Sequence, residues 1–159
     1  MKFKFGILLC LIVTLIISGC GGGGSKSGNK SNQVANANDS LINEVVTTYC
    51  HALKEKDYDT IISCAVYPFT IVNNNKKQSF DTPEIFKELL QQQLKDQSIY
   101  KYEPTLIKIN YSQNNQLANA LYKIKYEKGI DARLVKTSEF KLQFELQKTT
   151  EGWKFSKIE

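Results

Sequence analysis

Histidine and cysteine are the side chains in this sequence best suited to act as nucleophiles, general bases or metal ligands. The chain has one histidine, His51, and four cysteines, Cys10, Cys20, Cys50 and Cys64. A structural zinc site usually takes four such ligands, often with two in a Cys-x-x-Cys pair, and the sequence has no such pair. On a helical wheel at 100° per residue, His51 lies nearly opposite the apolar stripe of the helix predicted around it, so it should face water. We therefore predict no metal, no cofactor and no catalytic role for His51.

Cys50 and Cys64 belong to two predicted helices that are joined by a turn near Asp57. If the helices pack antiparallel, residues equally distant from that turn face each other, and these two cysteines are nearly equidistant. In an oxidising compartment a disulfide would close a short loop, worth ~3 kcal/mol in the chain-entropy model. The alternative is a pair of buried free thiols, and the sequence leaves both open.

Proton-transfer chemistry inside a pocket would need an ionisable side chain on an inward face, within hydrogen-bond reach of the substrate. The apolar faces of the predicted helices and main strands contain no Asp or Glu. Asp57 and Asp59 lie at a turn between helices, where a carboxylate is better explained as a helix cap. The sequence has no nucleophile–histidine pair and no glycine-rich phosphate loop, so it indicates no catalytic residues.

The predicted inward faces are rich in aromatic side chains instead. Tyr49 lies in the apolar stripe of the first helix, and strand alternation brings six others to the same side: Tyr122, Tyr126, Phe140, Phe144, Trp153 and Phe155. One interpretation is an apolar pocket whose phenol hydroxyls orient a ligand. The other is a packed core whose tyrosine hydroxyls reach the rim or a backbone carbonyl.

The N-terminus has the pattern of an export signal. Lys2 and Lys4 precede Phe5–Ile17, an almost wholly apolar run. As a helix this run would extend roughly 20 Å, which is short of the ~30 Å hydrocarbon core of a bilayer. A cleaved signal segment therefore fits this run better than a permanent membrane span.

The stretch Ile17-Ser18-Gly19-Cys20, followed by four glycines, resembles the lipobox of bacterial lipoproteins. The resemblance implies that the Cys20 thiol receives a diacylglycerol and that the signal is cleaved between Gly19 and Cys20. Two acyl chains would anchor the protein stably to the outer face of the cell membrane. The alternative is an ordinary secreted protein in which Cys20 is incidental.

The charge and arginine content argue against a nucleic-acid partner. Two of the 21 basic residues precede Cys20 and all 16 acidic residues follow it, so the formal net charge falls from +5 for the chain to +3 after Cys20. Arg133 is the only arginine, which argues against nucleic acid, since arginine is the side chain that recognises bases and phosphates in a bidentate way. Abundant Lys, Asn, Ile and Tyr indicate a low-GC bacterium, which we infer has a single membrane.

Three regions follow from these patterns. Residues 1–19 are the expected signal peptide, and residues 20–38 are rich in Gly, Ser, Asn and Lys and should form a lipidated flexible tether. Residues 39–159 are long enough for one domain with a single core.

Helical periodicity predicts a first helix over Leu41–Lys56, capped by Asp39 or Ser40, and a short second helix from Thr60 to about Val66, capped by Asp59 and ended by Pro68. A third helix starts at Thr82-Pro83-Glu84. The strands expected from alternation and turn residues are Phe69–Val72, Lys76–Phe80, Thr105–Tyr111, Leu117–Glu127, Leu134–Lys148 and Trp153–Ile158.

The resulting order, ααββαββββ, resembles the nuclear transport factor 2-like fold, also called the ketosteroid isomerase-like cone. The resemblance covers about Ser40 to Glu159 and rests on this order, on the stretch TYCHALKEKDYD and on the terminal GWKFSKIE. It implies an α+β domain in which a curved antiparallel sheet wraps a long helix and can leave a pocket. Fold alone does not assign an activity.

Three functions remain as hypotheses. The first is a non-enzymatic, membrane-anchored module that binds a partner protein, an envelope component or a small apolar ligand. The second is an isomerase or dehydratase whose pocket base comes from the Asn73–Phe80 hairpin or the Gly129–Arg133 loop. The third is an immunity or inhibitor protein whose tether presents the sheet face to another protein, a role that an exposed apolar patch on that face would favour and a purely lysine-rich face would count against. Lys123, Lys125, Lys141 and Lys154 are expected on that face, where they could contact anionic lipids or wall polymers or form an ordinary solvated surface.

Overall fold

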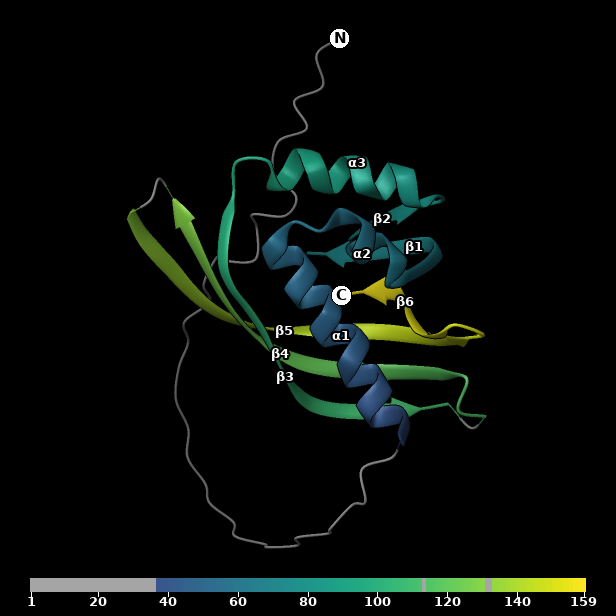
Figure 1. The fold of residues 1–159 in the computed structure, drawn as a ribbon. Coiled ribbons are helices and arrows are strands. Elements are labelled where there is room, and N and C mark those ends of the chain that lie inside the picture. Colours follow the sequence, from purple (N-terminus) through teal and green to yellow (C-terminus); the bar gives the residue numbers. More distant parts are fainter. Residues whose placement is uncertain (1–36, 113, 131–132) are drawn as a thin grey trace, which may run out of the picture.

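The computed structural model describes residues 37–112, 114–130 and 133–159 (Figure 1). The predicted order of elements is confirmed: α1 (Ala37–Glu55), α2 (Tyr58–Ser63), β1 (Ala65–Asn73), β2 (Lys76–Phe80), α3 (Pro83–Leu94), β3 (Ser98–Tyr111), β4 (Leu117–Ile130), β5 (Arg133–Thr149) and β6 (Gly152–Ile158). The expectations for the signal peptide, Cys20 and most of the tether fall outside the described residues.

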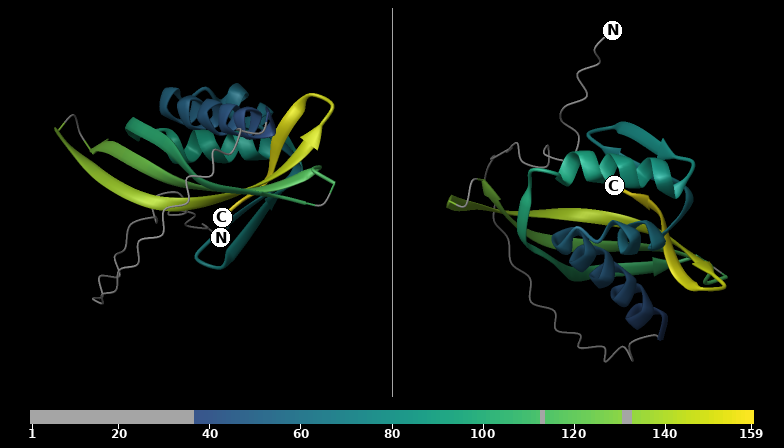
Figure 2. Two further views of the ribbon diagram at one scale, coloured as in Figure 1. Left: turned by 90° about the horizontal axis from the view of Figure 1, so that it is seen from below. Right: turned by 45° about the horizontal axis from the view of Figure 1, so that its top comes forward.

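The six strands form one curved sheet in the order β2-β1-β6-β5-β4-β3. Every neighbouring pair is antiparallel except β1 and β6, which run parallel, so the expectation of a purely antiparallel sheet was incomplete. The helices lie on one side of this sheet (Figure 2). That concave side holds the core, and the opposite side of β3, β4 and β5 faces solvent.

The apolar stripe predicted for the first helix is confirmed, because Ile42, Val46, Tyr49 and Leu53 of α1 are buried. The helix begins earlier than predicted, so Asp39 and Ser40 lie within its first turns and are not caps. Three polar contacts instead fix α1 on the sheet. The Tyr111 hydroxyl donates to Asp39, the Tyr122 hydroxyl to Asn43 and the Trp153 indole N–H to Asn38.

The short helix α2 is capped by Asp57 and not by Asp59 as predicted, since the Asp57 carboxylate accepts hydrogen bonds from the Thr60 backbone N–H and hydroxyl. Asp59 instead forms an ion pair with Lys87 of α3 at 2.6 Å. On its inner side α3 places Phe86 against Phe69 of β1 and Phe80 of β2, with ring centroids 4.9 Å apart in both cases. These contacts fix α3 above the β1–β2 end of the sheet.

Two strands extend well beyond their predicted starts. The predicted second helix ends at Ser63, and β1 begins at Ala65, so Pro68 lies inside a strand and does not end a helix. β3 begins at Ser98 and not at Thr105, and Pro104 lies within it. β3 is an edge strand, where proline is tolerated because one side of the strand needs no hydrogen-bond partner. The part of β3 that was not predicted, Ser98–Pro104, contains Tyr102, which belongs to the candidate site.

Candidate functional site

Part of the interior beneath α1 is a filled core. Five of the seven aromatic side chains that the sequence placed on the inward faces are buried there: Tyr49, Tyr122, Phe144, Trp153 and Phe155. The Tyr49 ring makes edge contacts with Phe144 at 6.3 Å and with Phe155 at 5.1 Å. The Tyr122 and Trp153 polar groups are satisfied by α1 side chains. For these residues the structure favours the packed-core interpretation.

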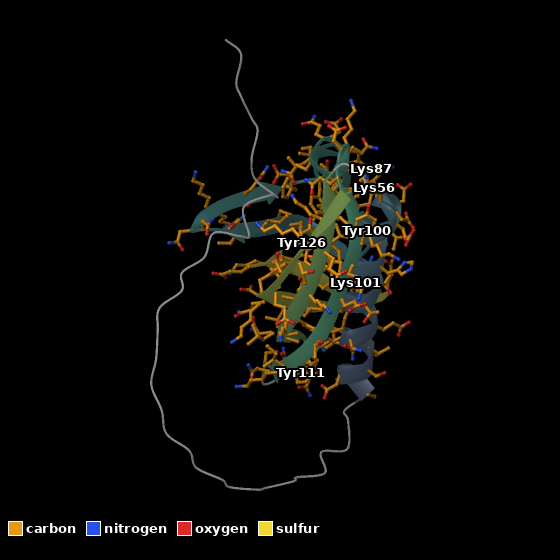
Figure 3. All side chains as sticks on the ribbon, turned by 90° about the vertical axis from the view of Figure 1, so that its left-hand side faces the viewer. Lys56, Lys87, Tyr100, Lys101, Tyr111 and Tyr126 are labelled. Atoms are coloured by element: carbon orange, nitrogen blue, oxygen red, sulfur yellow. The ribbon has the colours of Figure 1, made fainter. Side chains whose placement is uncertain are left out.

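Tyr126 and Phe140, the other two predicted lining residues, lie elsewhere on the concave side and are only half-buried. Together with Tyr102 of β3 they form an aromatic triad. The ring centroids are 5.7 Å apart for Tyr102–Tyr126, 6.2 Å for Tyr102–Phe140 and 6.4 Å for Tyr126–Phe140, all with edge-to-face geometry. In Figure 3, Tyr126 lies towards one end of the long strands and Tyr111 at the opposite end. Sequence reasoning missed Tyr102 because it started β3 three residues too late to include it.

Two polar atoms on this side of the interior are buried without a hydrogen-bond partner: Ser138 Oγ of β5 and Gln93 Oε1 of α3. Ser138 pairs directly with Tyr126, which pairs in turn with Tyr102, so the three residues form one row across β5, β4 and β3. Ser138 lies two residues from Phe140 and therefore on the same face of the strand. Leaving such a group unpaired costs roughly 1–3 kcal/mol, so buried polar atoms almost always have a partner. An unpaired atom in the interior therefore points to a bound molecule or an ordered water.

The electrostatic character of the interior is neutral. Among the described residues, none of those that are fully buried is polar or charged. Burial, and then the neighbouring Tyr49, Cys50 and Tyr126, hold the pKa of the Tyr102 phenol well above its ordinary value. Burial also raises the pKa of Tyr49, with Cys50, Cys64 and Tyr67 adding smaller effects. Phenols with raised pKa values stay protonated at neutral pH and can donate hydrogen bonds, but they are poor bases.

Cys50 and Cys64 are both buried and are free thiols in this structure, so the disulfide alternative is not formed in it. Burial raises the pKa of Cys64 to about 11, and burial together with Cys64 raises that of Cys50 further. The thiolate is the reactive form of cysteine, so both side chains should be inert in the folded protein.

His51 is exposed, as its wheel position predicted. It lies in an open groove of about 830 Å³ on the outer side of α1 and α2. The groove is lined by hydroxyl, amide and carboxylate side chains and by Ala52: Ser40, Asn43, Glu44, Thr47, Thr48, His51, Ala52, Glu55, Asp57 and Thr60. No group of three or more candidate metal ligands occurs in the described part of the chain.

The hairpin and the loop that were expected to supply a pocket base place no ionisable side chain in the interior, as far as their residues are described. In the Asn73–Phe80 hairpin the ionisable residues are Lys76 and Lys77, and both are exposed. The Gly129–Arg133 loop contains Asp131, which lies outside the described residues.

The convex face of the sheet carries the expected lysines, and three of them form ion pairs. Lys123 pairs with Glu139 at 2.6 Å, and Glu127 lies 3.8 Å from Lys125. Lys154 of β6 pairs with Glu151, which lies in the β5–β6 turn. Exposed ion pairs of this kind contribute little stability, and they keep this face soluble. No helix within residues 37–159, as far as they are described, is long and apolar enough to cross a bilayer.

No protein-family model and no curated protein sequence matches this chain. Solved structures with a similar fold do exist. A ketosteroid isomerase-like protein from Erwinia carotovora atroseptica has a TM-score of 0.64 at 12% identity, over 77% of this chain and 94% of that protein. An NTF-2 like protein of unknown function from Shewanella oneidensis has a TM-score of 0.59 at 13% identity, over 75% and 94%. An NTF2-like protein from Cytophaga hutchinsonii has a TM-score of 0.60 at 9% identity, over 75% and 93%. The domain therefore has the nuclear transport factor 2-like fold.

Proposed function

We propose that the domain is a non-enzymatic binding module that holds a small, neutral, largely apolar molecule between α3 and the concave side of the long strands. The observation that carries this proposal is the pair of unpartnered buried atoms, Gln93 Oε1 and Ser138 Oγ, beside a half-buried aromatic triad. Apolar walls with a few polar groups are the usual composition of small-molecule sites.

The lack of a buried carboxylate among the described residues supports binding over proton-transfer chemistry. An isomerase of this fold would need a base inside the cone, and the protonated phenols of Tyr49 and Tyr102 do not supply one. The ion pairs of Lys123 and Lys125 make that part of the convex face polar, whereas the immunity or inhibitor hypothesis would be favoured by an apolar patch there.

We also propose that the module is anchored through Cys20 on the outer face of the cell membrane. The support is the match of Ile17-Ser18-Gly19-Cys20 to the lipobox and the apolar run before it. Replacing Cys20 by alanine should move the protein out of the membrane fraction and remove the acyl mass from its N-terminus. The Cys10→Ala variant is the matched control, because Cys10 lies within the expected signal peptide and its loss should change neither property.

The binding proposal is tested by native mass spectrometry of the full chain, extracted from the membranes of its own bacterium in a mild detergent. The expected result is a reproducible extra mass of a few hundred daltons that is lost on unfolding. A Ser138→Leu variant should lose this mass, because leucine removes the unpartnered hydroxyl and adds bulk beside Tyr126, whereas Gln143→Leu on the convex face should retain it. A clean mass for the unmodified chain would overturn the proposal.

A further inference from the structure

Gln93 lies on the inward face of α3, among the residues that hold the helix on the core. Counting about 100° per residue from Phe86, Leu90 lies at about 40° and Leu94 at about 80°, while Gln93 lies at about 340°. Phe86, Leu90 and Leu94 are all buried, so Gln93 occupies the apolar stripe and not the solvent face. A glutamine at such a position needs a partner, because an apolar side chain would pack there without any unpaired group.

The unpaired atom of Gln93 is its amide oxygen, which only accepts hydrogen bonds. A ligand that satisfies it must therefore present an N–H or O–H donor. Ser138 Oγ adds no restriction, since a hydroxyl both donates and accepts.

Gln93 and Ser138 lie towards the same end of the sheet. Gln93 is in the last turn of α3, which leads into β3 at Ser98, and Ser98 pairs with Gly129 near the end of β4. Ser138 pairs with Tyr126, three residues from Gly129 on the same strand. The aromatic triad lies beside Ser138 in the register, because Tyr126 is paired with both Tyr102 and Ser138.

We infer that the ligand is a neutral aromatic or other flat ring compound that carries an N–H or O–H donor, and that Gln93 Oε1 accepts this hydrogen bond. This inference rests on the proposed binding function and goes further by naming the ligand class and the residue that selects it. The three rings of the triad already pack edge to face, and the ring of a ligand could pack against them in the same geometry. A neutral ligand fits better than a charged one, because no fully buried side chain among the described residues carries a compensating charge.

The test compares two probes of the same size and shape, indole and benzofuran, which differ in that indole has a ring N–H donor and benzofuran has an oxygen. The full chain is reconstituted in lipid nanodiscs, and binding is measured by equilibrium dialysis against empty nanodiscs, which corrects for partition into lipid. Indole should bind about tenfold more tightly than benzofuran, the size expected when a buried acceptor gains its donor. Indole-carboxylate, which adds a charge, should bind more weakly than either.

The Gln93→Leu variant should bring indole down to the affinity of benzofuran and leave benzofuran unchanged. Gln91→Leu is the matched control, because Gln91 is exposed on the same helix and should preserve the difference. Equal binding of the two probes to the unmodified chain, or a difference that survives in Gln93→Leu, would overturn the inference and leave the proposed pocket standing. If neither probe binds, the inference about the ligand class is also overturned. Native mass spectrometry of the full chain then tests the proposed binding function independently. Tightest binding of indole-carboxylate would contradict both.

Discussion

The ring of Tyr100 covers the backbone of Gly129 on the neighbouring strand. A Cβ atom added at Gly129 would lie 2.4 Å from Tyr100 Cε2 and 2.7 Å from its hydroxyl oxygen. Tyr100 is the extra residue of a β-bulge in β3, since Ile99 pairs with Lys128 and Lys101 with Glu127. The glycine therefore gives the Tyr100 ring a place to pack at the end of the long strands.

We expect Gly129→Ala to lower the free energy of unfolding by about 1 kcal/mol, because the Tyr100 ring must move away and lose its contact. In a Tyr100→Ala background the same substitution should be neutral or stabilising, because alanine suits a strand better than glycine does. Urea unfolding of the four proteins of this double-mutant cycle measures the coupling. Additive effects would show that the contact does not contribute.

A second prediction concerns Cys50 and Cys64. In the processed protein, with Cys10 removed and Cys20 lipidated, we expect neither thiol to react with a thiol reagent while the protein is folded, and both to react after denaturation. Burial of both side chains and their raised pKa values are the reason. Intact-mass analysis after alkylation counts the thiols directly. The absence of any reactive thiol in denaturant would mean that the exported protein carries the disulfide.

Five buried or half-buried tyrosines predict alkaline unfolding. Burial is the first cause of a raised pKa at Tyr49, Tyr67, Tyr102, Tyr111 and Tyr122, and it raises that of Tyr67 to about 12. In the unfolded chain these phenols ionise near pH ~10. Above that pH the folded state holds protons that the unfolded state has lost, so the free energy of unfolding falls as pH rises.

The stability that these phenols contribute should be complete below about pH 9 and decline between about pH 10 and pH 12. Phenolate absorbance and circular dichroism recorded together give the measurement, and most phenolate should form only as the secondary structure is lost. Ionisation of these five tyrosines near pH ~10 with an intact fold would contradict their raised pKa values.

The hydrogen bond from the Tyr111 hydroxyl to the Asp39 carboxylate joins β3 to the first turn of α1. Because the acceptor is a carboxylate, Tyr111→Phe should lower the free energy of unfolding by about 1–2 kcal/mol. Tyr58→Phe is a suitable control, since it removes a phenol hydroxyl from α2 with no such partner described for it. Thermal unfolding of both variants gives the comparison, and equal effects would show that the contact is unimportant.

Sequence periodicity predicted α1 and the β4–β5 pair well, because their burial alternates locally along the chain, as Phe140, Leu142 and Phe144 illustrate. It did not predict the parallel pairing of β1 with β6, which depends on segments far apart in the sequence and leaves no local signal. The first half of β3 was missed for a different reason. A proline and a bulge disturb its alternation, although an edge strand accepts both.

The sequence pattern also predicted the candidate site only in part. The aromatic alternation identified Tyr126 and Phe140 but did not separate them from the packed residues Tyr122 and Phe144, because pocket and core share one pattern. Gln93 did leave a signal. It falls on the wheel face of Phe86, Leu90 and Leu94, and a polar residue in an apolar stripe is the local inconsistency that functional sites often show.

That inconsistency leads to a last prediction, which concerns stability without ligand. Gln93→Leu should raise the free energy of unfolding of the ligand-free protein by about 1 kcal/mol, because it replaces an unpaired buried acceptor by an apolar side chain of similar size. Residues kept for binding often lower stability in this way. Gln91→Leu should change stability by less than about 0.5 kcal/mol, since it is a surface substitution. Urea unfolding after removal of any bound molecule measures both variants. A loss of stability in Gln93→Leu would mean that the amide already has a partner in the free protein, such as an ordered water, and that its oxygen is not held ready for a ligand.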